Sequence, residues 1–172
     1  MTEVSIRPFV MSDAADLART LNNKEVLDKL RDGLPFPYTE SDAEDFIRST
    51  LAADPDVNFH FAVVCGGKLI GNAGVFRREN VHRRTGELGY YIAEPYWGRG
   101  IMAQAVRLVC AEVFAKTDIL RIFATPFGFN HASCRVLEKV GFAREGVLRR
   151  DAVKNGKVVD VVMYALLNEE VK

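Results

Sequence analysis

The amino-acid sequence predicts an α/β fold whose sheet is mixed. Two pairs of strand-like runs are joined by Gly66-Gly67 and Asn155-Gly156, dipeptides that favour the tight turns of antiparallel hairpins. Between these hairpins the order changes to strand (87–93), glycine loop (96–100), helix (101–116) and strand (121–126). That order is typical of a parallel crossover. We therefore expect about seven mostly antiparallel strands with about four helices.

The remaining elements follow from hydrophobic periodicity and from capping and turn residues. Along the chain we expect a strand at 4–8, a helix at 14–21 with helical sequence through 30, a helix from about 40 to 53, strands between 59 and 77, a helix at 131–140, and strands at 142–148 and 158–167. Ser12-Asp13 would cap the first helix, and Thr39 or Ser41 the next long one. The segment Leu34-Pro35-Phe36-Pro37-Tyr38 cannot be helical, because each proline keeps the residue before it extended.

The bulk composition restricts the class of protein. A chain of 172 residues with 48% hydrophobic residues is of the size of one compact domain, so we expect a single domain spanning 1–172. Acidic and basic residues balance at 23 each, which gives no overall field for collecting polyanions. A dedicated nucleic-acid binder is therefore disfavoured.

Cysteine usage and hydropathy indicate the compartment. Cys65, Cys110 and Cys134 are odd in number and show no CxxC spacing, so reduced thiols are expected rather than disulfides or a zinc cluster. No stretch approaches the roughly 20 apolar residues of a membrane span, and the start of the chain lacks the pattern of a signal peptide. These features predict a cytoplasmic protein without a membrane partner.

The loop Tyr96-Trp97-Gly98-Arg99-Gly100-Ile101-Met102 is the strongest candidate for binding a ligand. It lies between a predicted strand and a predicted helix, where glycines let several backbone N–H groups converge beside the positive end of the helix dipole. This arrangement favours an anion such as a phosphate, to which Arg99 would add a charge-assisted contact. The alternative is a strand-to-helix turn that needs glycine for its geometry alone.

Two nucleotide-binding patterns compete for the same loop. The P-loop pattern GxxxxGK[ST] is absent. Gly98-x-Gly100-x-x-Ala103 formally matches the dinucleotide fingerprint, but an antiparallel hairpin precedes it, and the nearest acidic candidate, Asp118, comes before the next strand rather than at its end. Dinucleotide binding therefore stays a remote alternative.

Two separated motifs resemble the GNAT superfamily of N-acetyltransferases. The first is Glu87-Leu88-Gly89-Tyr90-Tyr91-Ile92 with Tyr96-Trp97-Gly98-Arg99-Gly100, and the second is Asn130-x-x-Ser133-x-x-Val136-Leu137-Glu138-Lys139-x-Gly141-Phe142. The resemblance covers nearly the whole chain and is greatest to the branch that acetylates N-terminal amines of ribosomal proteins. Ile6-Arg7-Pro8 and the Leu-Pro-Phe-Pro segment are also similar to that branch.

The resemblance implies a GNAT fold, in which the sheet splays apart after the strand ending near Ile92 and coenzyme A lies in the opening. It implies that the loop 97–102 holds the pyrophosphate, that the backbone near Ile92 engages the thioester and pantetheine, and that Asn130 lies near the pantetheine arm. The cofactor-binding residues expected on this basis are Ile92, Trp97, Gly98, Arg99, Gly100, Ile101, Met102 and Asn130.

The sequence departs from the superfamily pattern at two places. The loop is often written [QR]xxGx[GA], yet Trp97 and Met102 occupy its first and last positions. Many members also carry a tyrosine in the last helix as general acid, and the matching position here is Leu137. The usual acid is therefore missing or replaced.

Glu87 is the candidate general base. An amine attacks a thioester only when it is neutral, so a base must take its proton, and the resembled branch has a glutamate at this place. The alternative is a strand carboxylate paired to Arg77, Arg78, Arg83 or Arg84. On the resemblance to the family fold, backbone N–H groups near Ile92 would stabilise the oxyanion.

Ser133 is the candidate proton donor to the departing thiolate. Its position three residues after Asn130 is also what a helix N-terminus favours, with Asn130 as the cap, so a purely structural role is the alternative. A thiol of coenzyme A is acidic enough for water to serve instead. Cys134 lacks the histidine and aspartate pattern of a nucleophilic cysteine.

The acceptor side is less defined. Leu34, Phe36 and Tyr38 would wall the acceptor pocket, as in relatives, or simply connect two helices. The basic loop 77–84 would attract an acidic acceptor or the 3′-phosphate of the cofactor, or form a solvated hairpin tip. His60, His82 and His131 are spread in a way that does not suggest a metal site, so no metal is expected.

The sequence thus predicts an N-acetyltransferase that moves an acetyl group from acetyl-coenzyme A directly to a primary amine. A protein N-terminal α-amine is preferred over a small-molecule amine. The alternative from another class is a non-catalytic acyl-coenzyme A binding module, which the leucine at position 137 motivates. The oligomeric state, including a homodimer, is left open.

Overall fold

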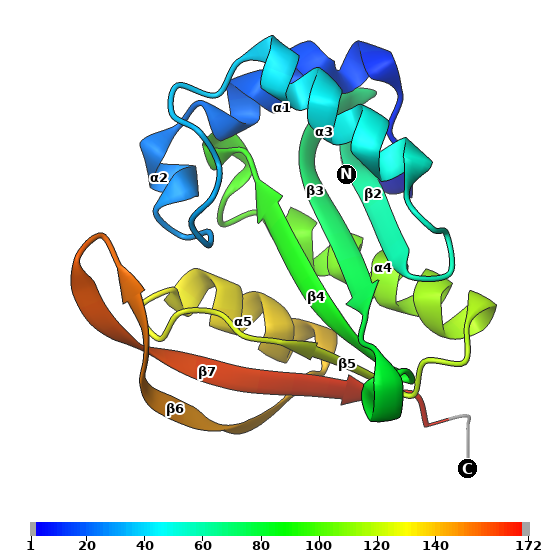
Figure 1. Cartoon of the computed structure of the whole chain (residues 1–172), viewed down its shortest axis with the longest axis vertical. Coiled ribbons are helices and arrows are strands. Elements are labelled where there is room, and N and C mark those ends of the chain that lie inside the picture. Colours follow the sequence, from blue (N-terminus) through cyan, green and yellow to red (C-terminus); the bar gives the residue numbers. More distant parts are fainter. Residues whose placement is uncertain (1–2, 170–172) are drawn as a thin grey trace.

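The computed structural model describes residues 3–169 (Figure 1). Residues 1–2 and 170–172, the two ends of the predicted 1–172 domain, lie outside the described residues. The strands form one seven-stranded sheet in the order β1-β2-β3-β4-β5-β7-β6. Its neighbouring pairs are antiparallel except β4 with β5, which are parallel. The predicted mixed α/β fold is confirmed.

The elements occur in the predicted order, although the strand predicted to end at 148 continues to Lys154 and the strand predicted to end at 126 ends at Ala124. They are β1 (Val4–Arg7), α1 (Ala14–Leu21), α2 (Lys24–Leu27), α3 (Glu40–Ala52), β2 (Asn58–Cys65), β3 (Lys68–Arg77), β4 (Thr85–Ile92), α4 (Ile101–Lys116), β5 (Arg121–Ala124), α5 (His131–Val140), β6 (Ala143–Lys154) and β7 (Lys157–Leu167), with 3-10 turns at Met11–Asp13, Asn80–His82 and Glu94–Tyr96. The bounds of α4 and α5 are those expected. The helix count exceeds the expected four because the helical sequence after α1 breaks at Asn22–Asn23 and forms α2, a single turn.

Local signals account for the turns and for the start of α3. The turn residues Gly66, Gly67, Asn155 and Gly156 all have positive φ, between 50° and 78°, as type I′ hairpin turns require. Thr39 caps α3: its hydroxyl accepts from the Asp42 N–H at 3.2 Å, and the Asp42 carboxylate accepts from the Thr39 N–H at 2.8 Å. This reciprocal capping box decides between the two predicted caps in favour of Thr39.

Two layers of helices cover the sheet (Figure 1). On one face α4 packs against β1–β4, through buried side chains such as Val63, Val75, Val106 and Val109. On the other face α1 and α3 cover β2 and β3, with Leu17, Leu21, Ile47 and Ala62 at their centre. Within residues 3–169, no helix has both the length and the apolar character needed to cross a membrane.

The two halves of the sheet separate at β4. The parallel pairing of β4 with β5 covers only Thr85–Glu87 against Arg121–Phe123, whereas β4 stays paired with β3 as far as Ile92. Beyond Glu87 the strand β4 therefore has a partner on one side only, and Figure 1 shows it diverging from β5 and β7. The splay that the family resemblance implies is present, and it begins at Glu87.

Candidate active site

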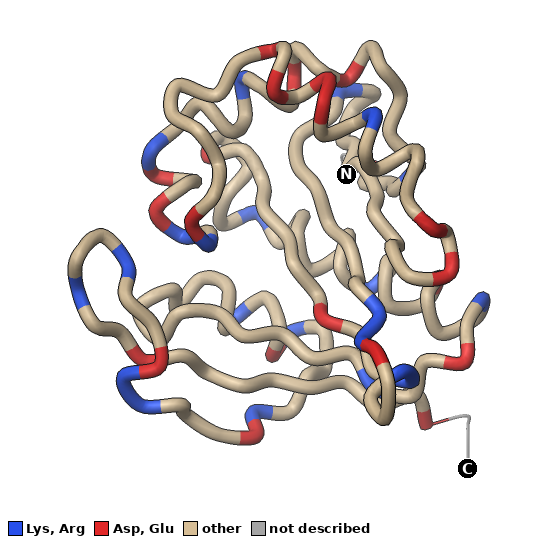
Figure 2. Tube along the Cα trace, viewed as in Figure 1, with Lys and Arg blue, Asp and Glu red and all other residues tan. Residues whose placement is uncertain are grey.

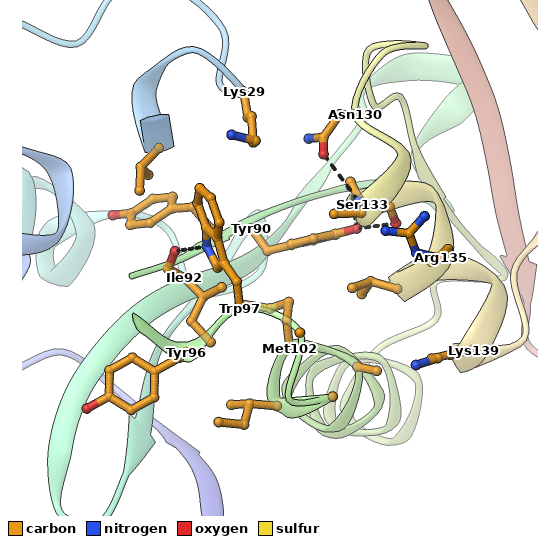
Figure 3. A pocket seen from close by; sticks show the side chains of 18 of the residues that line it. Lys29, Tyr90, Ile92, Tyr96, Trp97, Met102, Asn130, Ser133, Arg135 and Lys139 are labelled. Carbon is orange, nitrogen blue, oxygen red and sulfur yellow. Dashed lines mark hydrogen bonds between the residues drawn. The ribbon is translucent and has the colours of Figure 1, made fainter. Parts of the chain in front are cut away.

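A cavity of about 380 Å³ lies on the α4–α5 side of the splayed strand (Figure 3). It is bounded by the C-terminal part of β4, the glycine loop, the first turn of α4, one face of α5 and the end of α2. Its lining consists of Val26, Lys29, Leu30, Tyr90, Tyr91, Ile92, Tyr96, Trp97, Gly98, Gly100, Ile101, Met102, Ala103, Asn130, Ala132, Ser133, Arg135, Val136 and Lys139.

The glycine loop has the backbone geometry of an anion site. Gly98 and Gly100 both have φ of +73°, a conformation that side chains disfavour, and Gly100 is the N-cap of the 16-residue helix α4. The unpaired N–H groups and the positive dipole end of α4 therefore lie at the cavity. Ile101 and Met102 also line it. Arg99 does not; its guanidinium lies 5.8 Å from the centre of the Tyr96 ring.

Trp97, the first departure from the loop pattern, has a defined contact. Its indole N–H donates to the carbonyl oxygen of Ile92 at 2.8 Å, and the ammonium of Lys29 lies 4.4 Å from the centre of its ring (Figure 3). The tryptophan thus satisfies a carbonyl at the end of β4, beyond the residues that β5 pairs. Met102, the second departure, is 5% exposed and packs in the core that α4 shares with the sheet.

Asn130 and Ser133 form the predicted cap of α5 and also line the cavity, while their roles toward the cosubstrate stay predictions. The side-chain oxygen of Asn130 accepts from the Ser133 N–H at 3.2 Å and caps α5, while both residues also line the cavity. The Ser133 hydroxyl lies 2.7 Å from the phenol oxygen of Tyr90, a residue that the sequence analysis did not single out (Figure 3). Burial raises the pKa of Tyr90 above that of an ordinary phenol. Because successive side chains of a strand point to opposite faces, Tyr90 faces the side opposite to Glu87, and this alternation could have placed it at the cavity.

Three cationic side chains line the same cavity and were also missed. Arg135 and Lys139 lie one helical turn apart on α5, and Lys29 approaches from the turn that follows α2 (Figure 3). The spacing of Ala132, Arg135 and Lys139 in the sequence fits one helix face and could have identified the two α5 cations. Three cations beside a helix N-terminus suit the phosphates of coenzyme A, so the residues present fit this cosubstrate.

Glu87 lies in a different cavity. Its side chain is 17% exposed, and its Oε1 contacts Arg31 from the loop after α2 and accepts from the Thr125 hydroxyl at 3.4 Å. Its Oε2 lies 3.6 Å from Arg78. Arg31 also donates to the Thr125 hydroxyl at 2.9 Å. The predicted pairing with an arginine of the basic loop is therefore present through Arg78. Arg31 carried no sequence signal, because it is 56 residues away from Glu87.

An open cleft of about 670 Å³ surrounds Glu87. Its lining combines charged and apolar side chains: Arg31, Asp32, Arg78, Glu87, Phe123, Thr125, Phe127, Leu148, Asp151, Ala152, Val153, Lys154, Val161 and Met163. The Lys154 ammonium donates to Asp32 at 2.6 Å and the Asn155 amide to Asp28 at 3.0 Å, so the tip of the β6–β7 hairpin is tied to the loop after α2. Figure 2 shows charged positions on both of these segments.

The predicted acceptor wall lies elsewhere. Leu34, Phe36 and Tyr38 line neither of these two cavities. Tyr38 is 4% exposed in the core beneath α1 and α3, while Phe36 is exposed with the Lys24 ammonium 5.9 Å from its ring centre. Their role at the acceptor stays a prediction.

In the basic loop, Arg77 and Arg84 are engaged by Asp118. The Arg77 guanidinium donates to the Asp118 carboxylate at 2.6 Å, and that of Arg84 approaches it at 3.4 Å. Both pairs are at least partly exposed. They join the two ends of the basic loop to the segment between α4 and β5.

Known proteins match the chain along most of its length. Residues 3–143 match the family model described as an acetyltransferase (GNAT) domain. The chain is 34% identical over 119 residues to the probable N-acetyltransferase YjcK of Bacillus subtilis (strain 168), a match that covers 68% of this chain and 66% of YjcK. It is 30% identical over 174 residues to the putative ribosomal N-acetyltransferase YdaF of the same organism, covering 97% and 92% of the two chains.

A solved structure adds the three-dimensional comparison. Mycobacterium smegmatis RimJ, in complex with CoA-disulfide, matches with a TM-score of 0.86 at 25% identity, covering 98% of this chain and 83% of that chain. The splayed sheet, the glycine loop before α4 and the family match over residues 3–143 agree with one another. This chain belongs to the GNAT acetyltransferases, the family whose acetyl donor is acetyl-coenzyme A.

Proposed function

We propose that this chain, as one catalytic domain, transfers the acetyl group of acetyl-coenzyme A directly to a primary amine, with a protein N-terminal α-amine preferred to a small-molecule amine. The observation that carries the proposal is the pair of cavities at the splay of β4. One is lined by the glycine loop and by three cations, and the other holds Glu87. The printed name of YdaF, a putative ribosomal N-acetyltransferase, supports the preference for a protein acceptor.

The cavity on the α4–α5 side would bind the cosubstrate, which supplies an acetyl group activated as a thioester. The loop 97–102 and the first turn of α4 would hold its pyrophosphate through backbone N–H groups. Lys29, Arg135 and Lys139 would neutralise the phosphate charges. Asn130 would contact the pantetheine arm from the start of α5, and Arg99 would add a contact from the outer side of the loop.

The unpaired edge of β4 would face the thioester. Because β5 pairs only as far as Glu87, the backbone of the following residues through Ile92 lacks a strand partner on this side. N–H groups fixed in a sheet are preorganised donors, so those near Ile92 would stabilise the negative charge that develops on the carbonyl oxygen.

Glu87 would take the proton of the attacking amine, directly or through water. Two guanidinium groups hold its carboxylate in place, and the longer contact, 3.6 Å to Arg78, is on the oxygen that Arg31 does not contact. An amine that approaches from the open cleft would reach this oxygen. Alternation along β4 places the side chains of Glu87 and Tyr90 on opposite faces, about 10 Å apart along the strand. The gap beyond the last β4–β5 pair would connect the cleft around Glu87 with the cavity lined by Tyr90.

The alternative function is a non-catalytic acyl-coenzyme A binding module. Leu137 favours it, since this side chain has no proton to give and is fully buried. The two functions differ in what an added amine does. A binding module would retain acetyl-coenzyme A in the presence of any amine.

Thiol release from acetyl-coenzyme A tests the proposal, using N-terminal peptides, polyamines and aminoglycosides as acceptors with wild type, Glu87→Gln and Ser133→Ala. Amine-dependent release with an acetylated product in the mass spectrum is the expected result, with peptides the better acceptors. Tight binding of acetyl-coenzyme A without release by any amine would favour the binding module. Release only with polyamines or aminoglycosides would move the acceptor class to small molecules.

A further inference from the structure

The cavity contains a hydroxyl pair that joins two distant parts of the chain. The phenol oxygen of Tyr90 on β4 lies 2.7 Å from the Ser133 hydroxyl oxygen on α5, where either group can donate, and the Tyr90 O–H also donates to the backbone carbonyl of Ser133 at 3.1 Å (Figure 3). Both side chains line the cavity assigned to the cosubstrate. The pair is partly buried, so water competes little for these two hydroxyl groups.

This pair lies near the place where the family tyrosine is missing. Leu137 is one helical turn beyond Ser133 on α5, is fully buried and belongs to the core. It offers no donor to the cavity. A phenol nevertheless reaches the same region, from β4 instead of α5, and contacts the Ser133 side chain.

A serine alone is a weak choice of acid, because an alkoxide is far more basic than a thiolate. A phenol buried with a raised pKa is also a poor acid toward a thiolate, whose conjugate thiol titrates at about 8.5 in ordinary surroundings. Both hydroxyls therefore keep their protons in the working range of pH. Groups of this kind stabilise a charge by donating hydrogen bonds to it rather than by giving up a proton.

We propose that Tyr90 and Ser133 act as one donor to the departing sulfur: the Tyr90 O–H, shared between the backbone carbonyl and the closer hydroxyl oxygen of Ser133, donates to that hydroxyl, and the Ser133 O–H, thereby turned away from Tyr90, donates to the thiolate. When the C–S bond breaks, its electron pair stays on sulfur, and the thiolate later takes its proton from water. Tyr90 is thus a positioning residue that acts through Ser133. The kinetic consequence of this inference rests on the proposed function. The effect of the pair on the pKa of a bound coenzyme A thiol does not require that function.

Coenzyme A itself is the probe, because its binding tests the effect on a bound thiolate without requiring acetyl transfer. The ultraviolet absorbance of the thiolate gives the pKa of the coenzyme A thiol bound to wild type, Ser133→Ala, Tyr90→Phe, the double variant and Ser133→Thr. A charge-assisted hydrogen bond should lower this pKa by about one unit relative to free coenzyme A. We expect Ser133→Ala to abolish the shift, Tyr90→Phe to reduce it, the double variant to equal Ser133→Ala, and Ser133→Thr to keep it.

Tyr164→Phe is the matched control. It also removes one buried phenol hydroxyl, which donates to Glu138 on α5 at 2.8 Å, but Tyr164 does not line the cavity. It should leave the thiol pKa unchanged. The Asn130 cap accepts from the backbone N–H of Ser133, so Ser133→Ala leaves this cap intact. Thermal unfolding of each variant checks that the fold is preserved.

The outcomes are distinct. A thiol pKa in Tyr90→Phe equal to that in wild type would contradict the proposal that the two hydroxyls act as one donor. Shifts in Ser133→Ala and Tyr90→Phe that simply add in the double variant would also contradict it. Where an amine drives turnover, the single-turnover rate of thiol release should fall about tenfold in Ser133→Ala with little change in the KM for acetyl-coenzyme A, and the double variant should be no slower. The expected pattern of thiol pKa values without turnover by any amine would support the pair and count against the proposed function.

Discussion

Glu87 on β4 lies opposite Phe123 on β5 in the last register pair that joins the two halves of the sheet. The position is where the sheet opens, and the Glu87 carboxylate is contacted there by Arg31 and Arg78. A carboxylate at this place borders the cleft on one side of β4 and is separated by one strand from the cavity on the other.

Replacing Glu87 with Gln should reduce amine-dependent turnover by at least tenfold, because the amide cannot take a proton from the acceptor. The affinity for acetyl-coenzyme A, measured by calorimetry, should stay near that of wild type, since Glu87 does not line that cavity. Glu145→Gln is the control: it also removes an arginine-paired carboxylate from a strand, here one that Arg121 contacts, and should retain turnover. Equal turnover in wild type and Glu87→Gln would exclude the base.

Replacing Gly100 with Ala should weaken binding of coenzyme A. The φ of +73° is unfavourable for alanine by about 1 kcal/mol or more, and relief of this strain would reorient the N–H groups at the start of α4. Gly67→Ala provides the comparison, since its φ is +78°, it has open space for the methyl group, and it lies in the β2–β3 turn and does not line the cavity. Both variants should lose similar stability, but only Gly100→Ala should lose affinity. Equal affinities in calorimetry would show that the loop conformation is not needed.

Asp32→Asn should cost more stability than Lys154→Met. The Lys154 side chain is only 8% exposed while that of Asp32 is 75% exposed, so removing the carboxylate leaves a nearly buried ammonium with a weakened partner. We expect a loss of about 1–3 kcal/mol for Asp32→Asn, and less for Lys154→Met, which keeps the apolar stem of the side chain. Urea unfolding measures both. The reverse order would mean that the ammonium finds water or another acceptor.

Stability should fall between pH 6.5 and 4 because of His60. Burial lowers the pKa of His60 from 6.5 to about 4, so in this window the unfolded chain binds a proton that the folded chain does not. Stability is therefore complete above pH 6.5 and decreases as the pH falls, by at most about 1.4 kcal/mol per unit. The carboxyls of Asp13, Asp42 and Asp118, whose pKa values are lowered, contribute only at lower pH.

His60→Phe should flatten this part of the pH profile. The phenyl ring retains the contacts that the imidazole makes with Phe46 and Phe76, and it removes a buried ring nitrogen that has no hydrogen-bond partner. Thermal unfolding from pH 4 to 7 gives the comparison. A wild-type profile as steep as that of the variant would show that another group titrates in this window.

The amino-acid sequence was enough for the features that depend on neighbouring residues. The hairpins follow from Gly66-Gly67 and Asn155-Gly156, α3 begins at its predicted Thr39 cap, and the glycine loop precedes α4 as expected. Turn geometry, capping and periodicity depend on residues within a few positions of one another, so the local sequence specifies these features. The family motifs extended this local information to the splay of the sheet and to Asn130 and Ser133 beside the cavity.

Only the tertiary structure decided which side chains meet. Tyr90 and Ser133 are 43 residues apart, Arg31 and Glu87 are 56 apart, and Asp32 and Lys154 are 122 apart. No local pattern specifies these pairs, because each depends on how β4 leaves the sheet and on where α5 and the β6–β7 hairpin lie after packing. The sequence therefore determined the order of the elements and the glycine loop before α4, whereas the packing of the two sheet halves determined the partners of Glu87 and Ser133.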